Sequence, residues 1–80
     1  MEWKRGTVVR SLCGRDKESF LCVVTADEKY VFVCDGKARP LERAKRKNPK
    51  HIEKTPYMLT SRDLQSNRAV KQALKKFPEA

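Results

Sequence analysis

Four side chains in this sequence could together form a zinc site or a Cys–His nucleophile: Cys13, Cys22, Cys34 and His51. Three thiolates and one imidazole form a set of zinc ligands. The cysteines contain no CxxC pair, however, and Cys22 and Cys34 lie inside apolar runs, where free cysteine serves as a small buried hydrophobe. The sequence shows no orienting carboxylate for a Cys–His nucleophile. We therefore predict reduced cysteines, no metal, no cofactor and no catalytic residue, so the protein is not expected to be an enzyme.

Lysine and arginine supply a second kind of chemistry, the binding of phosphate. Arg15 and Lys17 lie in a short loop after Gly14, which lets the backbone approach a ligand closely. Residues 36–54 carry eight basic and two acidic side chains, a net charge of +6 out of +9 for the chain. Residues 1–35 are neutral overall. Such concentration of charge indicates a binding site for a polyanion, although an ordinary turn and a solvated charge run are the alternatives.

Aromatic side chains add the stacking of bases to this chemistry. Trp3 lies next to two cations, and Tyr57 lies just past the basic segment. We expect Trp3 to pack against the rim of the fold or the C-terminal helix rather than to stack on a base. Phe20, Tyr30 and Phe32 lie inside apolar runs, so we expect them in the core.

The first half of the chain must position these residues, and its pattern is typical of β-strands. Residues 7–12, 20–25 and 30–34 are runs of strand length that are rich in β-branched and aromatic residues. The polar residues 26–29 predict a hairpin between the second and third runs. Because the last two runs are apolar at successive positions, both faces are expected to be buried. In a small chain this favours a closed or half-closed barrel over an open flat sheet.

The segment after the third run predicts turns and short strands. Asp35-Gly36 is a strong tight-turn signal, because glycine accepts a positive φ without steric cost. Residues 38–41 are expected to return as a short strand, which Pro40 confines to a sheet edge. Residues 50–54 are expected to add a last short strand.

The C-terminal segment changes to a helical period. Ser66 is expected to cap a helix that begins at Asn67 and ends before Pro78. One side of this helix carries an apolar stripe: Val70, Ala73, Leu74 and Phe77. Another side carries three cations: Arg68, Lys71 and Lys75. A helix this short is marginal in water, so the stripe must dock on the sheet or on a partner.

The length of 80 residues limits the chain to one small core. We divide it into a β-barrel over residues 1–56, with a basic tract at residues 37–54, and a helical tail over residues 57–80. No run approaches the roughly 20 apolar residues of a membrane helix, and no apolar run follows the N-terminal charges as in a signal peptide. We therefore expect a cytoplasmic monomer without membrane contact.

The order of these features resembles the KOW motif. The residues that carry the resemblance are Gly6–Ser11, Gly14–Lys17 and Phe20–Val24, and it continues through Asp35–Glu42, Lys45–Lys47 and Lys50–Ile52. KOW motifs occur in small SH3-like barrels of ribosomal proteins and transcription elongation factors. The longer pattern is similar to short bacterial KOW-domain RNA-binding proteins, which resemble KOW-containing large-subunit ribosomal proteins of archaea and eukaryotes. The resemblance implies RNA binding, with Arg15 and Lys17 on the binding loop.

The predicted function is therefore non-catalytic binding of structured ribosomal RNA, in the large subunit or on an assembling particle. The candidate RNA-binding residues are the loop pair and the tract: Arg15, Lys17, Lys37, Arg39, Arg43, Lys45, Arg46, Lys47, Lys50 and His51. We expect the tract cations among residues 43–47 to be exposed, as in the loop and the helix. We expect the tract to contribute most to binding, then the loop, then the helix.

The alternative is a protein-interaction module of the transcription or translation machinery, because SH3-like barrels also bind peptides. That alternative predicts an apolar aromatic groove and a weak dependence of binding on salt. Fold alone does not decide between the two functions.

Overall fold

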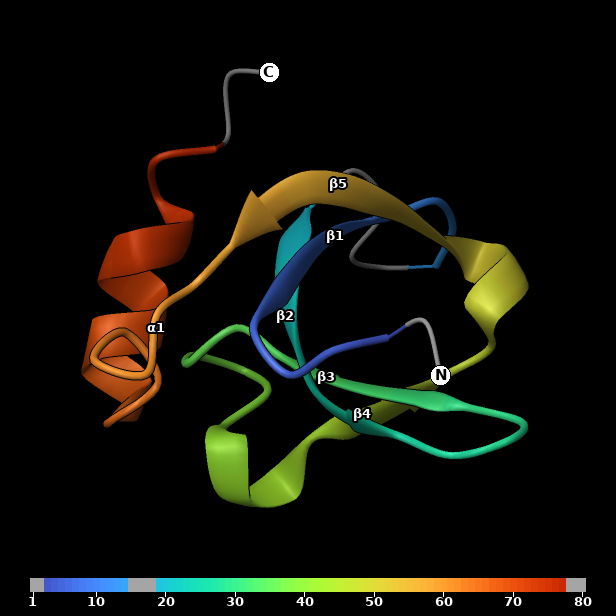
Figure 1. The fold of residues 1–80 in the computed structure, drawn as a ribbon, viewed down its shortest axis with the longest axis horizontal. Coiled ribbons are helices and arrows are strands. Elements are labelled where there is room, and N and C mark those ends of the chain that lie inside the picture. Colours follow the sequence, from blue (N-terminus) through green and yellow to red (C-terminus); the bar gives the residue numbers. More distant parts are fainter. Residues whose placement is uncertain (1–2, 15–18, 78–80) are drawn as a thin grey trace.

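The described part of the chain forms a five-stranded antiparallel sheet with one helix beside it (Figure 1). In the computed structural model the described residues are 3–14 and 19–77. The strands are β1 (Thr7–Ser11), β2 (Phe20–Ala26), β3 (Val31–Cys34), β4 (Lys45–Lys47) and β5 (Ile52–Met58). The helix is α1 (Asn67–Leu74), and the short 3₁₀ turns η1 (Leu41–Arg43) and η2 (Pro49–His51) flank β4. The prediction of a mainly β fold with a C-terminal helix is confirmed.

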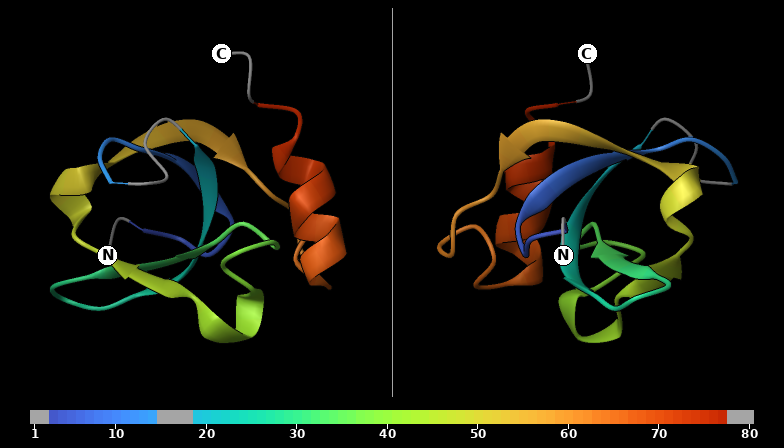
Figure 2. Two further views of the ribbon diagram at one scale, coloured as in Figure 1. Left: turned by 180° about the vertical axis from the view of Figure 1, so that it is seen from behind. Right: turned by 45° about the vertical axis from the view of Figure 1, so that its right-hand side comes forward.

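The sheet is strongly curved. Its strands follow the order β4-β3-β2-β1-β5. The register shifts near Val24 between β2 and β3 and near Val8 between β1 and β5, and such bulges bend a strand and increase its twist. As a result, β1 and β5 arch over β3 and β4 (Figures 1 and 2). Within the described residues β4 and β5 are the two edges of the ladder, so the sheet curves without closing.

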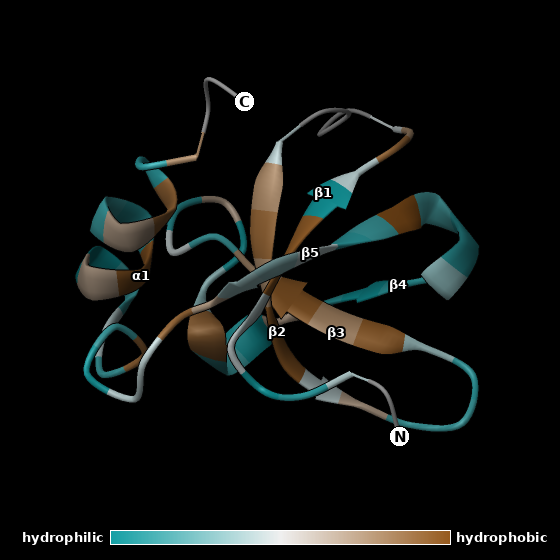
Figure 3. Ribbon diagram, turned by 45° about the horizontal axis from the view of Figure 1, so that its top comes forward, coloured by the Kyte–Doolittle hydropathy of each residue, from teal (hydrophilic) through white to brown (hydrophobic). Residues whose placement is uncertain are grey.

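The strands bury apolar side chains on both faces, as their continuous apolar runs indicate. Val8 and Val9 are neighbours in β1, so they point to opposite faces, and both are fully buried. One cluster lies among the strands: Val9, Leu21, Val23, Val31, Val33 and Ile52. The other joins the sheet to α1: Val8, Cys22, Cys34, Leu59, Val70, Ala73 and Leu74. Figure 3 shows the apolar character of β2 and β3 beside the hydrophilic edge strand β4.

Helix α1 begins where the sequence predicts. The Ser66 hydroxyl accepts a hydrogen bond from the Ala69 N–H (3.1 Å), which caps the first turn. The apolar stripe faces the sheet. The helix ends at Leu74, earlier than expected, and Phe77 follows in a turn in which its N–H donates to the Leu74 carbonyl (3.1 Å). Pro78, the predicted terminator, lies outside the described residues.

The segment after β3 contacts the first residues of α1. Gly36 has a φ of +77°, and a Cβ there would overlap the Asn67 carbonyl oxygen and lie 2.9 Å from the Lys71 nitrogen. The Asn67 side chain accepts a hydrogen bond from the Leu41 N–H (2.6 Å) and donates one to Glu42 Oε1 (3.0 Å). The helix is thus fixed to the sheet by close backbone contact as well as by apolar packing.

The strand predicted at residues 38–41 is not formed, and β4 takes its place. Asp35 Oδ1 accepts a hydrogen bond from the Arg39 N–H (2.9 Å). The Arg43 N–H donates to the Pro40 carbonyl (3.0 Å). These bonds hold the segment in consecutive turns, so the chain pairs with β3 only afterwards, through the basic residues of β4.

The last strand is longer than predicted and is displaced along the chain. Residues 50 and 51 belong to η2, and β5 starts at Ile52 and continues to Met58. It crosses the expected domain boundary after residue 56. Pro56 is tolerated because β5 is an edge strand, where a missing N–H breaks no second ladder.

Candidate nucleic-acid interface

The basic tract is distributed over successive elements rather than over one face. Lys37, Arg43, Arg46, Lys50 and His51 are exposed, and they lie after β3, in η1, in β4 and in η2. Arg39 and Lys45 are half-buried. The tract therefore does not come from one helix or strand, and its cations form a shaped site only where other elements approach them.

Lys47 corrects the expectation that the tract is exposed. Lys47 is only 7% exposed, and its Nζ donates a hydrogen bond to Ser11 Oγ (3.0 Å). The Ser11 hydroxyl donates in turn to the Cys13 carbonyl (3.1 Å). Side chains alternate along a strand, so Lys47 faces away from its exposed neighbour Arg46. An ammonium group buried in this way holds β4 to β1 and is not available to a phosphate on another molecule.

Arg46 also has a structural contact. Its guanidinium lies 4.6 Å from the centroid of the Tyr30 ring, within the range of a cation–π interaction. Tyr30 and Phe32 line a hollow of about 450 Å³ with Arg46. Both rings are half-buried, so the prediction that they belong to the core is wrong. Cations on an edge strand also hinder pairing with another chain, which gives β4 a structural reason for its charge.

Trp3 packs against the sheet, as expected. Its half-buried ring lies against the strand cluster that contains Val9 and Ile52. The Lys54 Nζ lies 5.7 Å from the ring centroid. Trp3 is therefore part of the packing at the sheet rim.

The loop pair Arg15 and Lys17 lies outside the described residues. Gly14, which precedes these residues, has a φ of +88°, a conformation that favours glycine. Ser19, which follows the loop, lines a hollow that also contains three lysines.

That hollow, the lysine cleft, is lined by residues from β2, from the turn after β3 and from the helix end: Ser19, Phe20, Asp35, Lys37, Lys71, Leu74 and Lys75. Its volume is about 350 Å³. Among the described residues that line it, three lysines outnumber one aspartate, so the described lining carries a net positive charge. The cleft exists because α1 packs against the turn at Gly36, which brings Lys71 and Lys75 beside Lys37.

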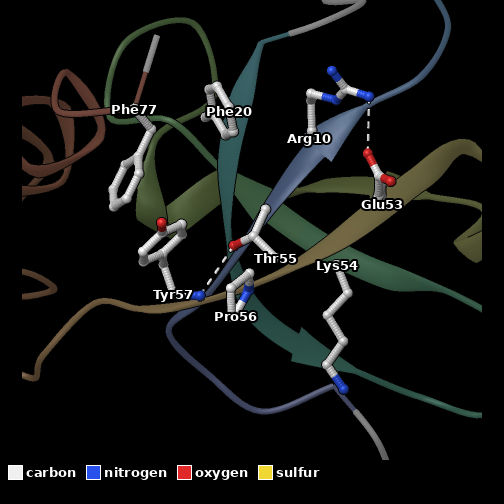
Figure 4. A pocket seen from close by; sticks show the side chains of 8 residues that line it. All are labelled: Arg10, Phe20, Glu53, Lys54, Thr55, Pro56, Tyr57 and Phe77. Carbon is white, nitrogen blue, oxygen red and sulfur yellow. Dashed lines mark hydrogen bonds and ion pairs between the residues drawn. The ribbon is translucent and has the colours of Figure 1, made fainter. Parts of the chain in front are cut away.

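A second hollow, the aromatic groove, lies on the other side of Phe20 (Figure 4). Its volume is about 420 Å³, and its lining residues are Arg10, Phe20, Glu53, Lys54, Thr55, Pro56, Tyr57 and Phe77. The Tyr57 and Phe77 ring centroids are 5.1 Å apart with 45° between the planes. Those of Phe20 and Phe77 are 5.9 Å apart at 42°. Tyr57 is 54% exposed, so one end of the groove is an accessible aromatic wall.

The other end of the groove carries charge. Arg10 is the cross-strand partner of both Phe20 and Glu53, and its Nη2 donates to Glu53 Oε1 (2.9 Å). Thr55 and Pro56 lie between the ion pair and the aromatic end (Figure 4). The groove thus runs from an apolar end to a polar end along the outer edge strand.

Sequence reasoning singled out Tyr57, and its protein-interaction alternative predicted an apolar aromatic groove, but it did not place the groove and it missed the cleft. Phe20 was expected in the core, yet it is half-buried and lines both hollows. Lys71 and Lys75 were recognised as a cationic side of the helix, without Lys37 as their neighbour. Strand alternation does not indicate the partial exposure of Phe20, because Leu21 and Cys22 are both buried and lie on opposite faces of β2. No local signal places Phe77 against Tyr57.

The cysteines lie in two environments. Cys22 and Cys34 are buried, free and directly opposite each other in β2 and β3. A hydrogen bond with Cys34, together with burial, raises the pKa of Cys22, so this thiol stays protonated. Cys13 is half-buried and also free. Within residues 3–14 and 19–77 no three potential metal ligands come together.

No family model and no curated protein matches this chain. In the described part of the chain, none of the helices combines the length and the apolar character needed to cross a bilayer.

Proposed function

We propose that the protein is a non-catalytic RNA-binding protein of the KOW type, whose curved sheet is an SH3-like barrel left open at one side. Its target is structured ribosomal RNA, in the large ribosomal subunit or on an assembling particle in the cytoplasm. The resemblance of residues 2–54 to KOW proteins supports RNA as the polyanion, and the net charge of +9 supports binding led by phosphates.

One observation carries this proposal: three lysines from distant parts of the chain converge on one hollow beside the half-buried ring of Phe20. Lys37 comes from the turn after β3, and Lys71 and Lys75 come from α1 and the residue that follows it. Like charges repel, so such a cluster in a small fold favours an anionic ligand that neutralises it. The exposed cations Arg43 and Lys50 add positive charge outside the cleft, and His51 is exposed beside Lys50.

The aromatic groove favours a second candidate function, a protein-interaction module. An apolar groove on a curved β-sheet also suits a proline-rich or apolar peptide. Such a peptide would gain nothing from the lysine cleft, and its binding would depend little on salt. The two functions therefore differ in a measurable way.

The test is the salt dependence of binding to a large-subunit ribosomal RNA fragment. If about six phosphates are contacted, log K should fall against log salt with a slope of about −4 to −5. A slope near zero, or no RNA binding at low salt, would reject the proposal. Sedimentation of a cell lysate at low and high salt would then show which ribosomal fraction holds the protein.

A further inference from the structure

We propose that the aromatic groove holds an unpaired nucleobase of the bound RNA, while the phosphates that flank this base contact Lys37, Lys71 and Lys75 in the lysine cleft. This inference rests on the proposed RNA binding and specifies it. It predicts that the protein distinguishes unpaired from paired RNA, which contacts with phosphates alone do not require.

The rings of the groove suit a flat ligand. Tyr57 presents more than half of its surface, while Phe77 packs between Tyr57 and Phe20 at centroid distances of 5.1 and 5.9 Å. Phe77 and Phe20 are anchored on the cluster that joins α1 to the sheet, which holds the wall in place. A base that stacks on an already ordered ring costs little side-chain entropy.

The position of Phe20 connects the two hollows. It lines the aromatic groove on one side and the lysine cleft on the other. A nucleotide has the same arrangement of properties, with an apolar aromatic base joined through a sugar to an anionic phosphate. Groove and cleft together therefore place an aromatic surface beside a positively charged one, as a nucleotide requires.

The charges favour RNA over a peptide as the occupant. Among its described lining residues, the cleft has three lysines against one acidic residue, Asp35. In the groove, Glu53 is already paired with Arg10 at 2.9 Å, so its charge does not oppose an anionic ligand. A neutral proline-rich peptide would match only the aromatic end of this surface.

Paired RNA cannot use this site in the same way. Bases in a duplex are stacked on each other, and only an unstacked base in a loop, bulge or end reaches an aromatic side chain. The protein should therefore bind a hairpin with an unpaired loop more tightly than a duplex with the same number of phosphates.

The experiment measures the affinity of the full chain for that hairpin and that duplex at one salt concentration. Tyr57→Ser should weaken binding of the hairpin about 5- to 150-fold, the range for loss of one stacked base. The same variant should leave binding of the duplex unchanged. Tyr57→Phe, which retains the ring, should restore the preference for the hairpin. Tyr30→Ser removes a tyrosine from the hollow beside Arg46 and should leave the preference intact.

A second measurement keeps the test independent of the stability of the variants. In the wild-type protein, nuclear magnetic resonance signals of the Tyr57 and Phe77 rings should shift when the hairpin is added, and shift less with the duplex. If hairpin and duplex bind equally and Tyr57→Ser changes neither, the inference is wrong while RNA binding stands. If neither RNA binds at low salt, the proposed function itself fails. Ring signals that shift with a proline-rich peptide and not with RNA would assign the groove to a protein partner.

Discussion

The two basic regions of this protein differ in what their cations do. At β4, a run of three consecutive cations includes Lys47, which is buried against Ser11, and Arg46, which stacks on Tyr30. At the helix, Lys71 and Lys75 are four residues apart, and folding adds Lys37 to form a cleft. The denser sequence pattern thus marks an edge strand with structural contacts, and the sparser one contributes to a shaped site. Charge density along a chain is a weak guide to where a ligand binds.

The largest expected effect comes from neutralising one region at a time. The tract triple is R43Q/R46Q/K50Q, and the cleft triple is K37Q/K71Q/K75Q, so both remove the same charge. If each removes three phosphate contacts, the affinity of the hairpin RNA falls about 100- to 500-fold at about 0.1 M salt. The tract triple should weaken hairpin and duplex alike, whereas the cleft triple should weaken the hairpin more. Filter binding with both RNAs measures this.

Circular dichroism of both triple variants is the control, because loss of the Arg46–Tyr30 contact affects the β4 edge. The tract triple could abolish the preference for the hairpin while the cleft triple keeps it. That result would show that the tract, and not the cleft, contacts the unpaired part of the RNA.

The next effect separates the helix from the sheet without altering a charge. Gly36→Ala forces a left-handed φ that costs about 1–3 kcal/mol, and its Cβ meets the backbone of α1. The free energy of unfolding from urea titration should fall by at least this amount, and the preference for the hairpin should weaken because the cleft opens. Gly36→Asn is the matched control, since asparagine tolerates this φ but still carries a Cβ. If the asparagine variant is fully stable, the close contact with α1 is not a determinant of the fold.

Lys47 provides a smaller test within the tract. Lys47→Met removes a hydrogen bond from a buried ammonium and should lower the free energy of unfolding by about 1.5–3 kcal/mol. Lys45→Met is the neighbour control on the same strand and should cost less, because Lys45 is only half-buried. Neither substitution should change the slope of log K against log salt as much as the tract triple does. A loss of RNA affinity without a loss of stability in the Lys47 variant would show that this residue contacts the ligand after all.

The smallest effect concerns the hydrogen bond between Glu42, in the basic tract, and Asn67, at the start of α1. The Asn67 amide holds the pKa of Glu42 below its ordinary value of 4.5, and a backbone hydrogen bond adds to this. A carboxylate with a lowered folded-state pKa stabilises the fold above its ordinary pKa, and this contribution is lost as the pH falls through the folded value. Thermal unfolding between about pH 6 and pH 2 should therefore show a slightly shallower acid loss for Glu42→Gln than for wild type. Identical profiles would mean that this bond contributes nothing measurable.

Local chemistry made several features predictable. Val8, Val9 and the later valines favour strands because their branched side chains pack on a pleated surface. Asp27 begins the hairpin between β2 and β3, where its carboxylate accepts hydrogen bonds from the N–H groups of Lys29 and Tyr30 (2.8 and 2.7 Å). The Ser66 hydroxyl caps α1 by accepting a hydrogen bond from the N–H of Ala69, three residues later in the chain. Each of these depends on neighbours in sequence, so the sequence carries the whole signal.

The missed features depend on contacts between distant residues. The strand expected at residues 38–41 gave way to β4 because Asp35 and Pro40 hold that segment in turns. The burial of Lys47 follows from the pairing of β4 with β3 and from Ser11 on β1. No periodicity in the sequence distinguishes this lysine from its exposed neighbours.

By itself, the sequence determined the fold class, the helix start, the excess of positive charge and the apolar runs that fill the core, since these follow from local preference and composition. Only the tertiary structure decided which cations line a shared hollow. Phe20, Tyr57 and Phe77 come from β2, β5 and the residues after α1, and Lys37 meets Lys71 across the turn at Gly36. The physical reason is that a site is a set of distances, and these distances are fixed when the helix packs its apolar stripe on the curved sheet.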